Sequence, residues 1–202
     1  MQDAANKIIS KVYGMGRGWV FTPNDFVAFG SRSAIDKALS RLAAEGTIRR
    51  LNRGMYDYPK AHPVLGILSP NPEAVAKALT GEAAVRIKPF GAYAANILGI
   101  TEQVPARIVF LTDGASKTVR VGKQEIRLKH TTPKNMATAG KSSGLVIEAL
   151  RELGKANIDE TVIGKITERL GEDEKKQLLK DMHYAPEWMQ KHLRLIAGGP
   201  TK

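Results

Sequence analysis

A chain of 202 residues with 43% hydrophobic and 25% charged residues has the composition of a soluble protein and is long enough for one large domain or two small ones. The absence of cysteine excludes disulfides, thiol catalysis and cysteine-ligated zinc. A net charge of +11 favours a polyanionic partner, and the basic excess lies in residues 1–60 and 86–141, whereas residues 142–202 are balanced.

The chain contains no apolar run of roughly 18 residues, the length at which a membrane span is expected. Its first residues also lack the apolar core of a signal peptide. We therefore expect no membrane span and a cytoplasmic protein.

Residues 22–58 have the pattern of two short helices followed by a hairpin. Thr22 and Pro23 are typical of a helix start, and Gly30 ends that helix. Ser31 can cap a second helix, which Gly46 ends. The apolar positions of the second helix recur three and four residues apart and predict one buried stripe: Ile35, Ala38, Leu39 and Leu42.

A hairpin follows, with strands over 47–51 and 55–58 and a turn at 52–54. An amphipathic helix over 2–13 and a short strand over 19–21, which we expect to pair with the hairpin, precede the two short helices. Helix, turn, helix and hairpin in this order predict a winged helix-turn-helix domain over residues 1–59.

The exposed side of the second helix is polar and basic, as expected for a helix that enters the major groove of DNA. We expect Arg32, Ser33 and Lys37 to contact the groove. Ser31 and Arg41 are assigned to phosphates, and Arg49, Arg50 and Arg53 to the wing. Asp36 departs from this pattern, because an acid facing DNA is unfavourable unless it orients an arginine or accepts from a cytosine amine.

Residues 60–72 contain three prolines, directly after Pro59, and predict a semi-rigid connector. Its apolar residues are expected to be buried along a second domain: Val64, Leu65, Ile67 and Leu68. Residues 73–202 then predict an α+β domain that begins with a helix over 72–80.

Strands are expected over 83–88 and 106–112, and as a hairpin over 118–130, with a helix over 91–98. Together they predict a small, mostly antiparallel sheet with helices. Residues 143–197 predict an all-helical end. In the hairpin, alternation places Arg120, Arg127 and Lys129 on the outward face.

No pattern in the chain predicts catalysis. The four histidines have no metal-ligand spacing, and no carboxylate cluster lies near them, so we expect no metal and no cofactor. The segment 139–142 (AGKS) resembles the end of a phosphate loop, but Asn135 stands where the first glycine belongs. Phe29-Gly30-Ser31 resembles the opening of a nucleotidyltransferase motif, but the paired carboxylates that hold its metal ions are missing. We expect a protein that is not an enzyme.

The runs GRGWVFTPNDF and SRSAIDKALSRLAAEGTIRRLNRGMYDYP resemble the N-terminal domain of AbiEi-type antitoxins. The later run IKPFGAYAANILGITEQVPARIVFLTDG, its following hairpin and the APEW segment are similar to the second domain of that family. The resemblance covers nearly the whole chain.

The resemblance implies an antitoxin of a type IV toxin–antitoxin (abortive infection) system that represses its own promoter by binding inverted repeats in double-stranded DNA. It also implies that the second domain counters a nucleotidyltransferase toxin, with Arg120, Arg127 and Lys129 as the antitoxicity surface. The alternative is an RNA- or protein-binding accessory regulator that uses the basic sheet face of the second domain. Exposed aromatic side chains for base stacking are not expected on that face.

Overall fold

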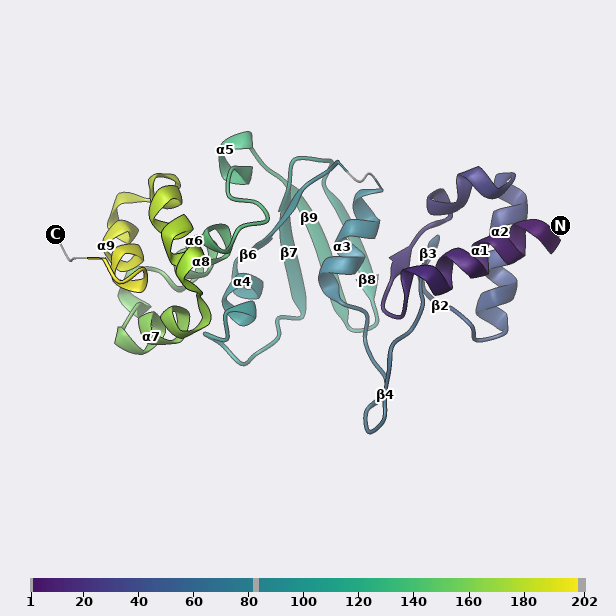
Figure 1. Cartoon of the computed structure of the whole chain (residues 1–202), viewed down its shortest axis with the longest axis horizontal. Helices are drawn as coiled ribbons and strands as arrows, with labels where there is room; N and C mark the ends of the chain where they lie inside the picture. Colours follow the sequence, from purple (N-terminus) through teal and green to yellow (C-terminus); the bar gives the residue numbers. More distant parts are fainter. Residues whose placement is uncertain (1, 82–83, 200–202) are drawn as a thin grey trace. The chain divides into compact units, whose positions relative to one another are not determined.

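The protein is an α+β chain, shown as a computed structural model in Figure 1, which describes residues 2–81 and 84–199 except for the side chains of Gln2 and Asp3. It divides into two compact units. The first is Met1–Ala83 with Val119–Lys123, and the second is Ala84–Thr118 with Gln124–Lys202. The main boundary between the units falls after residue 83, which is C-terminal to the connector expected at 60–72. Independent folding of residues 1–59 and 73–202 stays a prediction.

The first unit contains short strands between helices. Its elements are α1 (Gln2–Met15), β1 (Val20–Phe21), the 3-10 helix η1 (Pro23–Phe29), α2 (Arg32–Ala44), β2 (Arg49–Asn52), β3 (Met55–Asp57), β4 (Ala61–His62), β5 (Gly66–Ile67) and α3 (Pro72–Thr80). β3 lies between β1 and β2 and is antiparallel to both, so the short strand does pair with the hairpin as expected. The first of the two short helices is 3-10 rather than α.

The core of the first unit is built from the apolar stripes of α1 and α2. All four stripe residues expected in α2 are buried. They pack with Ile8 and Val12 of α1 and with the aromatic residues Phe21 and Phe26. The ring of Phe21 meets the ring of Phe26 edge-on, with centroids 5.5 Å apart. This packing fixes which side of α2 remains in contact with solvent.

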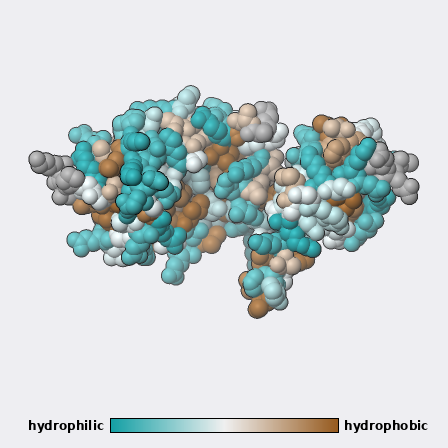
Figure 2. Space-filling view, viewed as in Figure 1, coloured by the Kyte–Doolittle hydropathy of each residue, from teal (hydrophilic) through white to brown (hydrophobic). Residues whose placement is uncertain are grey.

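The β4–β5 hairpin contradicts the expected burial of the connector. Val64, Leu65 and Ile67 are 85%, 72% and 64% exposed. The hairpin is drawn as a narrow loop in Figure 1, and its tip is brown in Figure 2. His62 Nδ1 accepts from the backbone N–H groups of Val64 (3.2 Å) and Leu65 (3.3 Å). The turn is therefore held by its own polar groups and not by burial of its apolar side chains.

The second unit combines a four-stranded sheet with a helical C-terminal part. The elements after residue 84 are β6 (Ile87–Phe90), α4 (Ala92–Ile97), β7 (Arg107–Thr112), β8 (Lys117–Val121), β9 (Gln124–His130), α5 (Pro133–Met136), α6 (Ser142–Leu153), η2 (Lys155–Asn157), α7 (Glu160–Arg169), α8 (Glu172–Asp181), η3 (Met182–Tyr184) and α9 (Glu187–Ile196). All of them belong to the second unit except the part of β8 from Val119 onward, which belongs to the first. The strand expected over 83–88 begins at Ile87, and residue 83 lies outside the described residues.

The strand order is β6-β7-β9-β8, so the second strand of the hairpin lies beside β7. β6 and β7 are antiparallel, whereas β7 and β9 are parallel. The parallel pair follows from the hairpin, because β8 takes the edge and β9 returns in the direction of β7. The sheet is therefore mixed.

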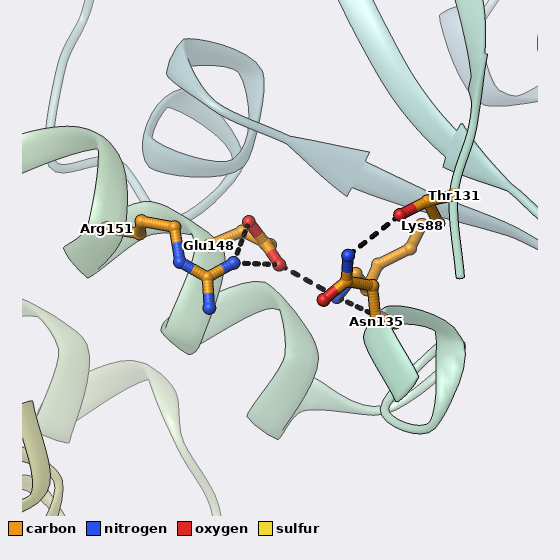
Figure 3. Close-up of polar contacts among 5 residues, drawn as sticks. All are labelled: Lys88, Thr131, Asn135, Glu148 and Arg151. Atoms are coloured by element: carbon orange, nitrogen blue, oxygen red, sulfur yellow. Dashed lines mark hydrogen bonds and ion pairs between the residues drawn. The ribbon is translucent and has the colours of Figure 1, made fainter. Parts of the chain in front are cut away.

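A buried ion pair joins the sheet to α6. Lys88 Nζ lies 2.8 Å from Glu148 Oε1 and donates to the backbone carbonyl of Asn135 (2.6 Å). Arg151 Nη1 donates to both oxygens of the same carboxylate (2.9 and 3.0 Å), as Figure 3 shows. Around this pair, α4 packs on α6, and the helices α6 to α9 share one apolar core. Both charges are compensated, which burial requires.

Candidate nucleic-acid interface

The α2 helix presents a polar and basic face on the side opposite its buried stripe. Ser31 caps the helix by accepting from the backbone N–H of Ala34 (3.3 Å). The exposed positions that follow the cap are Arg32, Ser33, Asp36, Lys37, Ser40 and Arg41. All of these except Arg41 line one shallow, open depression. The structure therefore brings the expected groove-contacting residues together on one surface.

Two of the three cations on this face form exposed ion pairs. Arg32 Nε lies 3.0 Å from Asp36 Oδ2, and Arg41 Nε lies 3.6 Å from Glu45 Oε1. Lys37 has no ion-pair partner among residues 2–81 and 84–199. Exposed pairs of this kind contribute only about 0–1 kcal/mol, so their cations can exchange partners. The face can therefore meet a polyanion without a large cost for breaking its own contacts.

Contacts between α1 and η1 hold the helix that precedes α2. Lys11 Nζ donates to the backbone carbonyl of Asp25 (2.6 Å) and lies over the rings of Phe26 (5.5 Å) and Phe29 (5.6 Å). The Asp25 carboxylate accepts from the backbone N–H of Thr22 (2.7 Å). These contacts hold η1, the helix that precedes α2, against α1.

The three arginines assigned to the wing have different surroundings in the β2–β3 hairpin. Arg50 and Arg53 are exposed at the strand and at the turn. Arg49 instead donates to both oxygens of the buried Asp57 (3.0 and 2.5 Å) and to the backbone carbonyl of Leu68 (3.0 Å). Arg50 and Arg53 are therefore available for an external phosphate, whereas the guanidinium of Arg49 is occupied within the unit.

The sequence of this chain matches the model of one protein family over most of its length. The model of a family of unknown function, DUF6088, matches residues 7–178, which is most of the chain. The protein belongs to the DUF6088 family. No curated protein matches it, and no solved structure matches it. The matched region runs from α1 into α8 and includes every residue assigned above to DNA binding.

The three basic residues expected to face outward in the β8–β9 hairpin are exposed. Arg120, Arg127 and Lys129 are exposed, whereas Val119, Ile126 and Leu128 are buried, so the expected alternation is present. Lys129 Nζ lies over the ring of Phe90 (5.7 Å). Arg120 belongs to the hairpin tip assigned to the first compact unit, and its backbone carbonyl accepts from the Asn52 side-chain amide (2.9 Å).

The basic segment that resembles a phosphate loop contacts a carboxylate of the same chain, that of Asp181. Lys141 Nζ lies 3.2 Å from Asp181 Oδ1, and the buried Ser143 hydroxyl donates to the same carboxylate (2.5 Å). Burial raises the pKa of Asp181, but the hydrogen bonds from Ser143, Gln177 and Lys141 and the charge of Lys141 outweigh it and hold that pKa below its ordinary value. A negative charge in this position opposes a bound phosphate, so the segment ties α6 to α8.

Among the described residues, no group of three or more His, Asp or Glu side chains is arranged to hold a metal ion. No helix in the same ranges is both long and apolar enough to cross a bilayer.

One residue beside the candidate interface was not predicted from the sequence. Asn24, in η1, accepts from Arg32 Nη1 through its side-chain oxygen (3.3 Å). The two residues lie in different helices, and no periodicity relates them. Asp36, one turn after Arg32, suggested an oriented arginine, but no sequence signal pointed to Asn24.

Proposed function

We propose that this DUF6088 protein is a sequence-specific double-stranded DNA-binding regulator whose first unit is a winged helix-turn-helix. The observation that carries the proposal is the solvent face of α2, on which Arg32, Ser33 and Lys37 lie together beside an open depression. A helix that exposes arginine and polar side chains along one face matches the width and the donor–acceptor pattern of the major groove.

The order of elements supports the winged-helix reading. η1 and α2 are joined at Gly30 and Ser31, α1 packs beneath both, and the β1-β3-β2 sheet follows. In this arrangement α2 is the recognition helix. The β2–β3 turn carries Arg53 and is the wing, while Ser31 and Arg41 lie at the edges of the α2 face and contact phosphates.

The proposed cellular role is repression of its own promoter through inverted repeats, together with antitoxicity against a nucleotidyltransferase toxin. The support for this role is the resemblance of the N-terminal sequence runs and of the later run IKPFGAYAANILGITEQVPARIVFLTDG to the two domains of AbiEi-type antitoxins. The exposed side chains of Arg120, Arg127 and Lys129 supply a second basic surface that α2 does not use. In this proposal the chain acts without chemistry of its own.

The DNA-binding proposal is tested by fluorescence anisotropy with the full chain at about 0.15 M salt. The probes are the duplex upstream of its own gene and a shuffled duplex of equal length. Specific binding exceeds nonspecific binding by roughly 10³-fold or more in typical regulators. Lys37→Ala is expected to reduce the preference, and the control Lys165→Ala, an exposed lysine of α7, is expected to preserve it. Equal affinity of the wild type for both duplexes overturns the proposal.

The antitoxin role is tested by co-expression with a nucleotidyltransferase encoded in the neighbouring reading frame. The wild type is expected to restore growth. The triple variant Arg120→Ala, Arg127→Ala, Lys129→Ala is expected to lose rescue while it keeps its DNA preference. A neighbouring frame that encodes no nucleotidyltransferase counts against the antitoxin role. Full rescue by the triple variant counts against the assigned surface. Neither result affects the DNA-binding proposal.

A further inference from the structure

Arg32 is the first residue of α2, and its guanidinium is held on two sides. Nε donates to both oxygens of Asp36 (3.1 and 3.0 Å), one turn further along the helix. Nη1 donates to the side-chain oxygen of Asn24 in η1 (3.3 Å). Contacts from two different helices therefore set the direction of one exposed arginine side chain.

Helix stability does not account for this arrangement. The side chains of Arg32 and Asp36 are 60% and 51% exposed, and pairs this open contribute little free energy. The order is also the less favourable one. A cation in the first turn meets the positive end of the helix dipole, and an acid is better placed before its basic partner than after it.

The contacts leave three of the five guanidinium N–H donors without a partner among the described residues. An arginine has five N–H donors in a planar fork. Nε and one Nη1 donor are used by Asp36 and Asn24, and Nη2 has no hydrogen-bond partner within residues 2–81 and 84–199. The edge formed by Nη1 and Nη2 can place two parallel donors on a planar pair of acceptors. In the major groove, guanine O6 and N7 form that pair.

We propose that Arg32 reads a guanine in the major groove, and that Asp36 and Asn24 are positioning residues that hold its guanidinium for this contact. The inference rests on the proposed DNA-binding function and adds one base to its recognition site. It also explains the acid on a face that meets phosphates. Asp36 lowers the general attraction to DNA, and in return it restricts Arg32 to one orientation.

The proposal predicts an effect of Asp36→Ala that simple electrostatics does not. Removal of a negative charge from a DNA-facing surface should strengthen binding to every duplex alike. Loss of a positioning residue should instead reduce the preference for guanine at one position, even while nonspecific binding becomes stronger. The two effects separate when affinity is measured on matched duplexes.

The experiment uses the full chain and a duplex obtained by selection from a randomised library. Each guanine of that duplex is replaced in turn by 7-deazaguanine, which lacks the N7 acceptor, and by each of the other bases. The wild type is expected to lose about 5- to 150-fold in affinity at one guanine of each half-site, the range for a bidentate contact. Arg32→Ala is expected to bind the natural and substituted duplexes equally at that guanine.

Asp36→Ala is expected to lose most of the guanine preference, and Asp36→Asn, which keeps an acceptor, is expected to retain part of it. The control is Glu73→Ala in α3, whose carboxylate is also 51% exposed and pairs with Lys77 at 2.8 Å in an i,i+4 arrangement. This control should keep the full preference. Equal thermal midpoints of all variants exclude a folding defect.

The outcomes separate the two proposals. If the wild type enriches no sequence from the library, the proposed DNA-binding function fails. If it enriches a sequence but Arg32→Ala keeps the same base preference at every guanine, the regulator stands and the Arg32 contact is overturned. If Arg32→Ala loses the preference and Asp36→Ala keeps it in full, the positioning role of Asp36 is overturned.

Discussion

Arg49 and Asp57 face each other across the β2–β3 pair, and the Asp57 carboxylate, only 1% exposed, accepts two hydrogen bonds from the guanidinium. Arg50, the next residue, points to solvent. Two adjacent arginines of one strand therefore have different surroundings, because successive side chains of a strand point to opposite faces.

Arg49→Ala should lower stability, whereas Arg50→Ala should lower DNA affinity. Without Arg49 the buried Asp57 carboxylate loses both side-chain donors, which costs about 1–3 kcal/mol of unfolding free energy. Urea denaturation of the full chain measures this loss. A thermal midpoint of Arg49→Ala equal to that of the wild type would contradict the structural role.

Arg50→Ala and Arg53→Ala should each weaken binding to specific and shuffled duplexes by a similar factor. Each removes one phosphate contact, so the slope of log affinity against log salt should fall by about one unit. Anisotropy titrations at several salt concentrations give the slope. A loss confined to the specific duplex would instead assign these residues to base reading.

Leu39→Ala should destabilise the first unit without removing any group that faces DNA. The side chain is fully buried among α1, η1 and α2, and a truncation of this kind costs about 2–5 kcal/mol. Ser40→Ala, the neighbouring residue on the exposed face, should change stability by less than about 0.5 kcal/mol. Similar unfolding curves for the two variants would be inconsistent with the observed orientation of α2.

Lys88→Met should be strongly destabilising, because Glu148, which is 1% exposed, would keep only the partly exposed Arg151 as its cation. Removal of one partner of a buried ion pair costs about 3–5 kcal/mol. The double variant Lys88→Met, Glu148→Leu removes both charges and should recover much of the loss. Urea denaturation compares the three proteins, and a double variant less stable than the single one would contradict the assignment.

His192 should make stability depend on pH. The ring is buried in the C-terminal helices, and neither nitrogen has a hydrogen-bond partner among the described residues. Burial lowers its pKa, and the nearby charges of Lys191 and Lys155 lower it further. Below the ordinary histidine pKa of about 6.5, His192 binds a proton more readily in the unfolded chain than in the folded chain. The folded state is therefore fully stable with respect to this group above that pKa and loses stability as the pH falls below it.

The measurement is the thermal midpoint at about pH 7.5 and pH 5.5. His192→Leu is expected to reduce the difference between the two midpoints. His183→Ala, which alters an exposed histidine, is expected to leave that difference unchanged. An unchanged pH dependence in His192→Leu would show that other groups cause it.

Much of the local structure could be predicted from the sequence. The stripe Ile35, Ala38, Leu39 and Leu42 specified both the existence of α2 and its buried face, because helical periodicity and burial are coupled within a single element. The alternation of Arg127 and Lys129 with Ile126 and Leu128 specified the faces of β9 in the same way. Caps at Ser31, Asn71 and Asp159 were predictable because a cap is a contact between neighbours in the chain.

Pairings between distant residues were decided only by the tertiary structure. The parallel contact of β7 with β9 depends on which strand of the hairpin docks on the sheet, and alternation within a strand carries no information about that choice. The exposure of Val64 and Leu65 was mispredicted because a residue's hydrophobicity favours burial but does not supply a surface to cover it.

The candidate site shows the same division between sequence and structure. The sequence by itself determined that Arg32, Ser33 and Lys37 share the solvent face of one helix, because a spacing of one turn fixes the face. Only the tertiary structure placed Asn24 beside Arg32 and Asp57 beside Arg49, and so separated an oriented arginine from a structural one. The physical reason is that an ionised side chain takes its role from the groups within about 4 Å of it, and these come from segments whose meeting the local pattern does not encode.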